Sequence, residues 1–295
     1  MCMMALLYRV ARGTPILVAA NREERYDRPT QYPKIQPGLP RVVCGIDRLA
    51  GGTWLGVNQF GLFCAVTNRR KARVPAEPRS RGLLCRELLD LRTAREAAVY
   101  AAKELATGAY AGANYVCADV RCAAVVHGGN TIEVVDLSPG LHIVSSGDVD
   151  DLKDERHEFV RRMLELHTLD SAVTFLAASS RVFSRKPDGS GRRGVVISEG
   201  DFGTVSSTLL SLPRKIQQAV YQYAPGPPCE CAYDDLSALL RQVLSTERSR
   251  KARESDGQGP KHHDKSHVKA KDGKAKDGKA KGGQGKGKEP VKKKK

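Results

Sequence analysis

Short apolar runs separated by turn-forming residues fill about the first 70 residues of the chain, and their composition is typical of β-strands. The first two runs flank Ala11-Arg12-Gly13-Thr14, which suits a hairpin. Apolar residues then recur three and four positions apart, which indicates two helices, and Thr93-Ala94-Arg95-Glu96 has the sequence of a capping box. The expected strands are 3–10, 15–20, 42–46, 53–58 and 62–67, followed by helices at 82–91 and 94–106.

The rest of the chain repeats this order of strands and paired helices. The expected elements are strands at 114–120, 122–127, 131–137 and 141–145, helices at 151–166 and 169–183, strands at 195–198, 204–210 and 216–223, and a closing helix at 234–244. Strands that come in blocks, rather than in strict alternation with helices, indicate an α+β fold. The order therefore predicts a layered sandwich of sheets and helices.

The positive charge is concentrated at the C-terminal end. The chain of 295 residues has a formal net charge of +16, but 18 of its 49 basic and 7 of its 33 acidic residues lie in 246–295, which leaves +5 on 1–245. Because 246–295 contains no Phe, Trp or Tyr, it cannot bury enough apolar surface to offset the entropy of ordering. We expect one domain at 1–245 and a disordered Lys-rich tail at 246–295. The tail is either simply solvated or contacts nucleic acid or an anionic membrane weakly through its charge.

The apolar runs and the cysteines indicate a cytoplasmic protein. No apolar run approaches the ~18 residues that span a bilayer, and the N-terminal run is too short for a secretory signal. Most of the eight cysteines sit inside apolar runs, where a cysteine packs as a small core residue.

Two patterns that suggest a cofactor or a metal are discounted. The segment 189–194 matches a dinucleotide-binding motif, but it precedes an expected strand rather than a helix, so we expect a flexible loop. Cys229 with Cys231, and the histidines His262, His263 and His267, lack a second ligand pair at suitable spacing. We expect no cofactor and no metal.

Cys2 differs from the other cysteines because it follows the initiator methionine directly. A side chain this small normally permits removal of Met1, which would leave a thiol and an α-amino group on one residue. The amine has a reference pKa of roughly 7.7–8.0, so it can take the proton of the thiol near neutral pH without a separate histidine. The alternative is an incidental cysteine in an edge strand.

Two further segments carry candidate ligand-binding groups. The apolar run 16–20 is followed at once by Asn21-Arg22-Glu23-Glu24, so we expect the strand to end there and to deliver polar groups to a sheet edge. A solvated turn is the alternative. Trp54, the only Trp in the chain, stands among the glycines of 51–56. Glycines allow a close backbone approach beside a large ring, although core packing explains the segment equally well.

These motifs together resemble the NRDE family, the family of the transport and Golgi organisation protein 2. The resemblance rests on the order of Met1-Cys2, Asn21-Arg22-Glu23-Glu24, Tyr26 with Arg28-Pro29, Asp47, the segment 51–56 and Thr67-Asn68, and it continues through Asn114 and 202–208. It covers about residues 1–225 and leaves out the tail.

The resemblance implies a four-layer αββα sandwich similar to the N-terminal nucleophile hydrolases. In such hydrolases a terminal cysteine attacks a non-peptide amide carbonyl, and an acyl-thioester forms and is hydrolysed. By this likeness Cys2 is nucleophile and base, Glu23 orients the terminal amine, and Asn114 donates to the oxyanion, a contribution typically worth about 2.7–4 kcal/mol. The expected ligand-binding residues are Asn21, Arg22, Glu24, Trp54 and Asn68.

The chain departs from the family pattern at three places. Glu23 stands where the family has Asp, Ser146 where it often has Asn, and Val205 where it often has Arg. The last two changes remove an anion-binding group and a hydrogen-bond donor from the expected pocket. They leave the substrate open but do not touch Cys2.

Two functions follow from the resemblance. The first is an amidohydrolase of the terminal-cysteine type that acts on a C–N bond of a small amide or acyl-lipid. The second is a non-enzymatic carrier or regulator, because the family is linked to Golgi organisation and to haem and acyl-lipid handling. In that case the pocket binds a ligand, and Cys2 binds rather than attacks, as a thiolate can bind haem iron.

Overall fold

The computed structural model describes residues 2–188 and 194–255, and for 247–255 the backbone only. The first sheet contains β1 (Met3–Tyr8), β2 (Ile16–Arg25), β10 (Gly140–Val144), β11 (Ser198–Glu199), β12 (Phe202–Leu212), β13 (Val220–Ala224) and β14 (Asp234–Asp235). The second contains β3 (Thr30–Gln36), β4 (Val42–Asp47), β5 (Leu55–Asn58), β6 (Phe63–Asn68), β7 (Ala113–Ala118), β8 (Ala123–Gly128) and β9 (Ile132–Asp136).

Within the described residues, each sheet has seven antiparallel strands. The first has the order β10-β1-β2-β12-β13-β14, with β11 paired to β12, and the second runs from β3 to β9 in chain order. β2 is therefore a central strand, held by β1 on one side and by β12 on the other.

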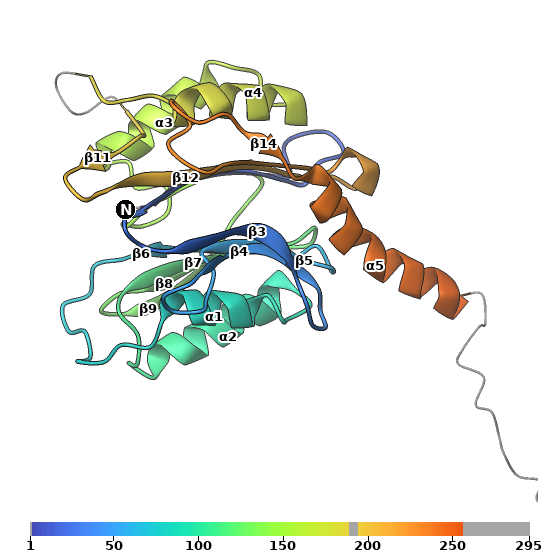
Figure 1. The fold of residues 1–295 in the computed structure, drawn as a ribbon, viewed down its shortest axis with the longest axis horizontal. Coiled ribbons are helices and arrows are strands. Elements are labelled where there is room, and N and C mark those ends of the chain that lie inside the picture. The colour runs from blue at the N-terminus through green and yellow to red at the C-terminus, as the bar shows by residue number, and fades with distance from the viewer. Residues whose placement is uncertain (1, 189–193, 256–295) are drawn as a thin grey trace, which may run out of the picture.

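Two helix pairs cover the outer faces of the sheets (Figure 1). The helices α3 (Glu155–Glu165) and α4 (Ala172–Phe183) pack on the first sheet, and α1 (Arg81–Leu88) and α2 (Ala94–Ala106) pack on the second. The layers run helix, sheet, sheet, helix. This arrangement confirms the predicted α+β fold with four layers, αββα.

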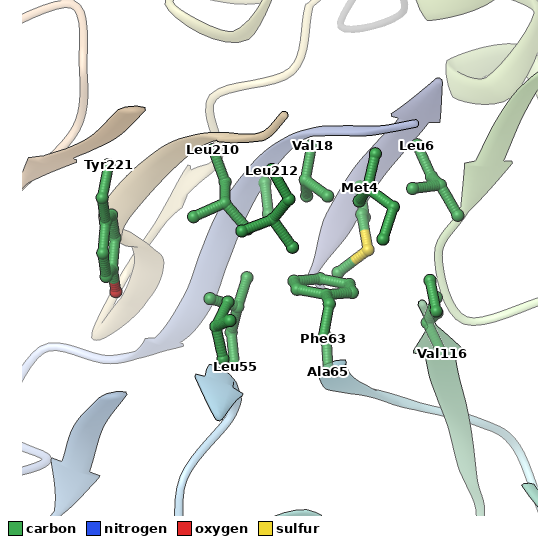
Figure 2. Close-up of a cluster of buried hydrophobic side chains, with 14 of the residues drawn as sticks. Met4, Leu6, Val18, Leu55, Phe63, Ala65, Val116, Leu210, Leu212 and Tyr221 are labelled. Atoms are coloured by element: carbon green, nitrogen blue, oxygen red, sulfur yellow. The ribbon is translucent and has the colours of Figure 1, made fainter. Parts of the chain in front are cut away.

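The two sheets face each other across a core of apolar side chains. Met4, Leu6, Val18, Leu210, Leu212 and Tyr221 of the first sheet point toward Leu55, Phe63, Ala65 and Val116 of the second (Figure 2). In β1 the intervening residues Met3, Ala5 and Leu7 instead pack under α3 and α4. Since successive side chains of a strand point to opposite faces, β1 is apolar along its whole length because it is buried on both sides.

Two features of the sheets differ from the expectation. The polar segment Asn21-Arg22-Glu23-Glu24 does not follow the end of a strand. It continues β2 to Arg25, with Asn21 opposite Ser207 and Glu23 opposite Thr204 of β12, so the backbone keeps its ladder partners. β3 was not expected, because it contains Pro33 and few apolar residues. It is the edge strand of the second sheet, and its register shifts between Gln31 and Lys34, as strands with proline permit.

The helices confirm the expected pairs: α2 has the expected bounds, α1 ends earlier than expected, and α3 and α4 begin later. Their N-terminal ends coincide with side-chain caps, and the predicted capping box of Thr93 and Glu96 is present at α2. The expected strand 216–223 is divided into a 3₁₀ turn (Ile216–Gln218) and β13. The closing helix α5 (Ser237–Ser255) runs past the predicted domain boundary at residue 245, so the first part of the expected tail is helical. Residues 256–295 and the 189–193 part of the glycine-rich segment lie outside the described residues.

The cysteines of the described chain are all free. Cys44, Cys64, Cys85 and Cys117 are buried in the cluster between the second sheet and its helices, as expected for packing residues. The other four, Cys2 among them, are partly exposed. In the part of the chain that the structure describes, no helix has the length and apolar composition needed to cross a membrane.

Candidate active site

A pocket with a volume of about 300 Å³ opens beside the start of β1, between residues of the two sheets, and Cys2 forms part of its wall. Met3 lies opposite Asn21, so Cys2, one residue earlier, lies next to Arg22 of β2. The rest of the described lining comes from β2, from the segments around β4, β5 and β6, and from the start of α1. It consists of Arg22, Glu23, Glu24, Arg28, Asp47, Ala50, Thr53, Trp54, Val66, Asn68, Pro78, Arg79, Ser80, Arg81, Gly82 and Ala111.

The pocket brings together most of the residues that the sequence indicated. Besides Cys2, it contains Glu23 and the expected ligand-binding residues Arg22, Glu24, Trp54 and Asn68. Asn21 lines a smaller hollow of about 10 Å³, to which Cys2 also belongs. These residues come from four separate stretches of the chain, and the sandwich places them around the pocket and the hollow that shares Cys2 with it.

Glu23 is the buried acid of the pocket. Its side chain is 0% exposed, and its Oε1 accepts a hydrogen bond of 2.8 Å from Nη2 of Arg156 on α3. Burial raises the pKa of the Glu23 carboxyl, and the positive charge of Arg156 offsets only part of that rise. The carboxylate therefore depends on nearby positive charge to stay ionised.

The Cys2 thiol is not acidic by itself. The residue is partly exposed, but burial around its thiol raises the pKa, and the neighbouring Glu23 carboxylate raises it further. A hydrogen bond from the Glu23 backbone and the charge of Arg22 act in the opposite direction without reversing the shift. A thiol in this environment needs a base close by before it can act as a nucleophile.

Arg22 and Trp54 form one wall of the pocket together. The guanidinium carbon of Arg22 lies 4.5 Å from the centre of the Trp54 ring, a cation–π contact, and its Nη1 donates to Thr30 Oγ1 over 3.2 Å. The ring packs on Gly45 of β4, where an added Cβ would lie 2.3 Å from the Trp54 Cη2 atom. The position of Trp54 therefore depends on a glycine outside the glycine-rich segment.

The glycines of 51–56 were expected to allow a close approach to the Trp54 ring. Gly52 instead allows the β4–β5 loop to approach the start of α1 closely. A Cβ added to Gly52 would lie 2.0 Å from the backbone carbon of Gly82. The Thr53 amide donates to the Gly82 carbonyl over 2.9 Å. Since Thr53 and Gly82 both line the pocket, this close backbone approach shapes its wall.

A network of charges crosses the pocket mouth. Arg28 donates through Nε to Asp47 Oδ2 over 3.1 Å, and Glu24 Oε2 lies 3.6 Å from Arg28 Nε and 3.9 Å from Arg22 Nη2. The Arg28 guanidinium is one of the groups that hold the pKa of Asp47 below its usual range, although burial acts against it. Glu24 is therefore part of an ion network around the ligand space.

Asn114 is not part of the described lining of this pocket. Its side-chain Nδ2 donates to the carbonyls of Ser145 (3.0 Å) and Gly147 (2.9 Å), and its Oδ1 lies 2.8 Å from His127 Nδ1. Both amide hydrogens are thus directed at the segment after β10. The structure does not bring the predicted oxyanion donor to the described lining around Cys2.

Asn21 supports the strand next to Cys2. Its Nδ2 donates to the carbonyl of Phe183 at the end of α4 over 3.0 Å, which ties β2 to the helix layer. Of the departures from the family pattern, Val205 falls at the register shift between Thr204 and Ser206, opposite Glu23 and Arg22. It is partly buried there and brings no charge to the site.

Three site residues were not foreseen. Arg156 reaches Glu23 across 133 positions of sequence, Arg79 enters the lining from the segment before α1, and Arg81 is the first residue of that helix. The sequence offers no local signal for any of them, since each is one arginine among 49 basic residues. Among residues 2–188 and 194–255, no three His, Cys, Asp or Glu side chains lie close enough to hold a metal ion.

A four-layer αββα sandwich with a cysteine at the second position, set in a polar pocket, is the arrangement expected of a protein like the N-terminal nucleophile hydrolases. Comparison with known sequences gives the family. A profile described as Transport and Golgi organisation 2 matches residues 1–221, and the chain belongs to this family.

Individual relatives match over a shorter stretch. The Transport and Golgi organization 2 homolog of Mus musculus is 31% identical over 140 residues, which is 44% of this chain and 50% of the mouse protein. The corresponding protein of Homo sapiens is 30% identical over the same proportions. The chain thus spans about half the length of the curated relatives it matches.

The solved structures that match the chain are distant in sequence. An N-acylethanolamine-hydrolyzing acid amidase ortholog of Caenorhabditis elegans has a TM-score of 0.47 and 13% identity over 71% of this chain and 92% of that one. Penicillin V acylase of Agrobacterium tumefaciens has a TM-score of 0.45 and 12% identity over 81% and 87%. The assignment of the fold rests on the layers and strand order described above.

Proposed function

We propose that the chain, once Met1 is removed, is an amide hydrolase in which Cys2 is the nucleophile and its own α-amine is the base. The observation that carries the proposal is the position of Cys2, in the wall of a 300 Å³ pocket and beside the buried Glu23 carboxylate. The raised pKa of the thiol supports a mechanism in which the base is attached to the same residue.

The reaction has two halves. The Cys2 thiol gives its proton to the α-amine, and the thiolate attacks the amide carbonyl carbon. The C–N bond breaks, the leaving nitrogen takes the proton from the ammonium, and the acyl group stays on sulfur as a thioester. Water then gives a proton to the amine and attacks the thioester carbonyl, after which the C–S bond breaks, sulfur regains the proton and a carboxylic acid leaves.

Glu23 has the position of an orienting group in this scheme. An ionised carboxylate beside Cys2 accepts a hydrogen bond from the ammonium and stabilises the charge that forms when the thiol is deprotonated. Because Asn114 is not in the described lining, the oxyanion needs another donor. Arg22 lies in the pocket lining, on the strand next to Cys2.

The lining favours a compact, polar amide as substrate. Four arginines and three acidic residues line a volume at the lower end of the range for ligand sites, and Trp54 is the one large apolar side chain in the described lining. A long acyl chain or a haem would find little apolar surface there. We therefore propose that the substrate is a small amide, because the pocket is small and its lining is mostly polar.

The test begins with the intact mass of the protein, because retention of Met1 would overturn the mechanism. If Met1 is absent, hydrolysis of a panel of small amides is compared between the wild type and Cys2→Ala and Cys2→Ser. Loss of about three orders of magnitude or more is expected in Cys2→Ala. Cys122→Ser is the matched control, since Cys122 is also partly exposed but lies outside the pocket lining, and its turnover should equal that of the wild type.

Turnover that persists in Cys2→Ala would refute the nucleophile. Specific ligand binding without turnover of any amide, and its loss on replacing Glu24 or Trp54, would instead support the carrier or regulator. In that case the role in Golgi organisation, haem or acyl-lipid handling would rest on binding alone.

A further inference from the structure

We propose that Arg156 is a positioning residue that fixes the Glu23 carboxylate in its ionised form beside Cys2. The inference rests on the proposed function, because the carboxylate matters there as the acceptor for the Cys2 ammonium. It adds a residue from the helix layer, far from the N-terminal motifs, to the apparatus around the nucleophile.

The contact between the two side chains is short, and Glu23 is more deeply buried than Arg156. Arg156 Nη2 lies 2.8 Å from Glu23 Oε1, and the side chains are 23% and 0% exposed, respectively. The guanidinium thus reaches inward from solvent to a carboxylate that solvent does not reach. A charge-assisted hydrogen bond in this setting is screened little by water.

The guanidinium is itself held in place. The same Nη2 donates to the carbonyl of Val195 over 3.0 Å, so Arg156 links α3, β2 and the segment before β11. Its backbone amide donates to Oδ1 of Asp154, the N-cap of α3, over 2.9 Å, which places the residue in the first turn of the helix. Because the Val195 carbonyl fixes the guanidinium and the helix cap fixes the backbone that carries it, Arg156 holds Glu23 in one position at low entropic cost.

The other groups near Glu23 do not replace this charge. On β2, Arg22 and Glu24 flank Glu23 with opposite charges and lie 3.9 Å from each other. β12 offers Thr204 in register, which does not titrate, and Cys2 before β1 interacts unfavourably as a thiolate. His157 follows Arg156 on α3, and burial lowers its pKa, so it is neutral near pH 7. Arg156 is the leading source of positive charge from the helix layer.

Loss of Arg156 would leave a buried carboxylate without this compensating charge, and such a group takes up a proton rather than staying ionised. At low pH the protonated Glu23 of Arg156→Gln would be equivalent to the amide of Glu23→Gln. At high pH Glu23 would ionise again. The variant is therefore expected to behave like Glu23→Gln in acid and to approach the wild type in base.

The experiment measures kcat/KM for the best amide of the panel from about pH 6 to about pH 8.5 in the wild type, Arg156→Gln, Arg156→Lys, Glu23→Gln and Arg162→Gln. We expect the ratio of Arg156→Gln to wild type to rise about tenfold or more over this range, since each unit of pKa shift changes the ionised fraction up to tenfold. Arg156→Lys keeps the charge and should show a smaller rise. Arg162→Gln removes an exposed arginine from the same helix and should give a constant ratio near one.

A second readout does not need turnover. The rate at which iodoacetamide alkylates Cys2, followed by peptide mass, reports the ionisation of the thiol. The same convergence is expected: Arg156→Gln should follow Glu23→Gln at low pH and the wild type at high pH. Melting curves identify a variant that does not fold. If Arg156→Gln does not fold, the alkylation rates of Arg156→Lys and the wild type are compared instead.

A loss of activity that is equal at every pH would assign Arg156 a purely structural role and overturn the proposal, as would an unchanged Arg156→Gln. Failure of the proposed function has a different signature. If no amide is turned over, or if Cys2→Ala keeps its activity, the alkylation profiles still decide whether Arg156 controls the charge of Glu23.

Discussion

Gly52→Ala should destabilise the protein strongly, because it forces α1 away from the β4–β5 loop. The new Cβ would lie 2.0 Å from the backbone carbon of Gly82 and 2.3 Å from the backbone nitrogen of Leu83, distances that no methyl group tolerates. Both atoms belong to backbone and cannot turn aside. The 2.9 Å hydrogen bond from the Thr53 amide to the Gly82 carbonyl would stretch or break as the helix moves.

The cost follows from these contacts. Overpacking typically costs about 1–3 kcal/mol. Because the clashing atoms at Gly52 belong to the backbone and cannot rotate away, we expect a cost of about 3 kcal/mol. For a domain of this size that corresponds to a fall in melting temperature of about 2–4 °C per kcal/mol, or roughly 6–12 °C. Guanidinium unfolding followed by fluorescence is a direct assay, because Trp54 is the only Trp of the chain and lines the same pocket.

Gly140→Ala is the matched control for Gly52→Ala. Its added Cβ would meet its nearest neighbour, His142 Nε2, at 3.7 Å, an ordinary contact, so a change within about 0.5 kcal/mol is expected. A Gly52→Ala variant as stable as Gly140→Ala would refute the reasoning, because it would mean that the loop and the helix are not held at this distance.

Two other residues lead to predictions that separate fold from chemistry. Asn114→Ala should lower the free energy of unfolding by about 1–3 kcal/mol, because the hydrogen bonds from its side chain to the Ser145 and Gly147 carbonyls are lost, and should leave the rate of Cys2 alkylation unchanged. A stable variant with a hundredfold loss of turnover would restore the oxyanion role. For His142, burial lowers the pKa, but the hydrogen bonds to Asp150 (2.7 Å) and to the Ser138 carbonyl outweigh it, and the pKa is raised. The protonated ring therefore stabilises the fold fully below its unfolded pKa of about 6.5, and this stability is lost as pH rises through the folded pKa. His142→Gln should lower the melting temperature more at about pH 6 than at about pH 9, and an equal loss at both pH values would contradict this assignment.

Elements governed by local chemistry were predictable from sequence. The capping box of Thr93 and Glu96 is a contact within one helical turn, so its residues alone indicate where α2 begins. The apolar run at 3–10 indicated a strand, and the structure shows why it has no polar face, because both faces of β1 are buried. The order of strand blocks and helix pairs then indicated a layered α+β sandwich, and the family resemblance implied its four layers.

The end of β2 and the presence of β3 could not be predicted from local sequence. The polar residues after Ala20 look like a turn, but β12 pairs with β2 as far as Arg25, beyond the last β1 partner at Asn21, and keeps the segment extended. β3 has a proline and a weak apolar pattern, and only pairing with β4 makes it a strand. Whether a weak segment forms a strand depends on the strands that pair with it, and not on the segment alone.

The same division applies to the site. The sequence by itself determined that Cys2 is the reactive candidate, since a thiol and an amine on one residue form a nucleophile and base wherever the fold places them, and it indicated Glu23, Arg22 and Trp54 through their motifs. Only the tertiary structure decided which groups surround them. It brought Arg156 to Glu23 across 133 positions and turned Asn114 toward the segment after β10. Charge and hydrogen bonding act over a few ångströms of space, and no pattern along the chain records which distant residues the layers bring within that range.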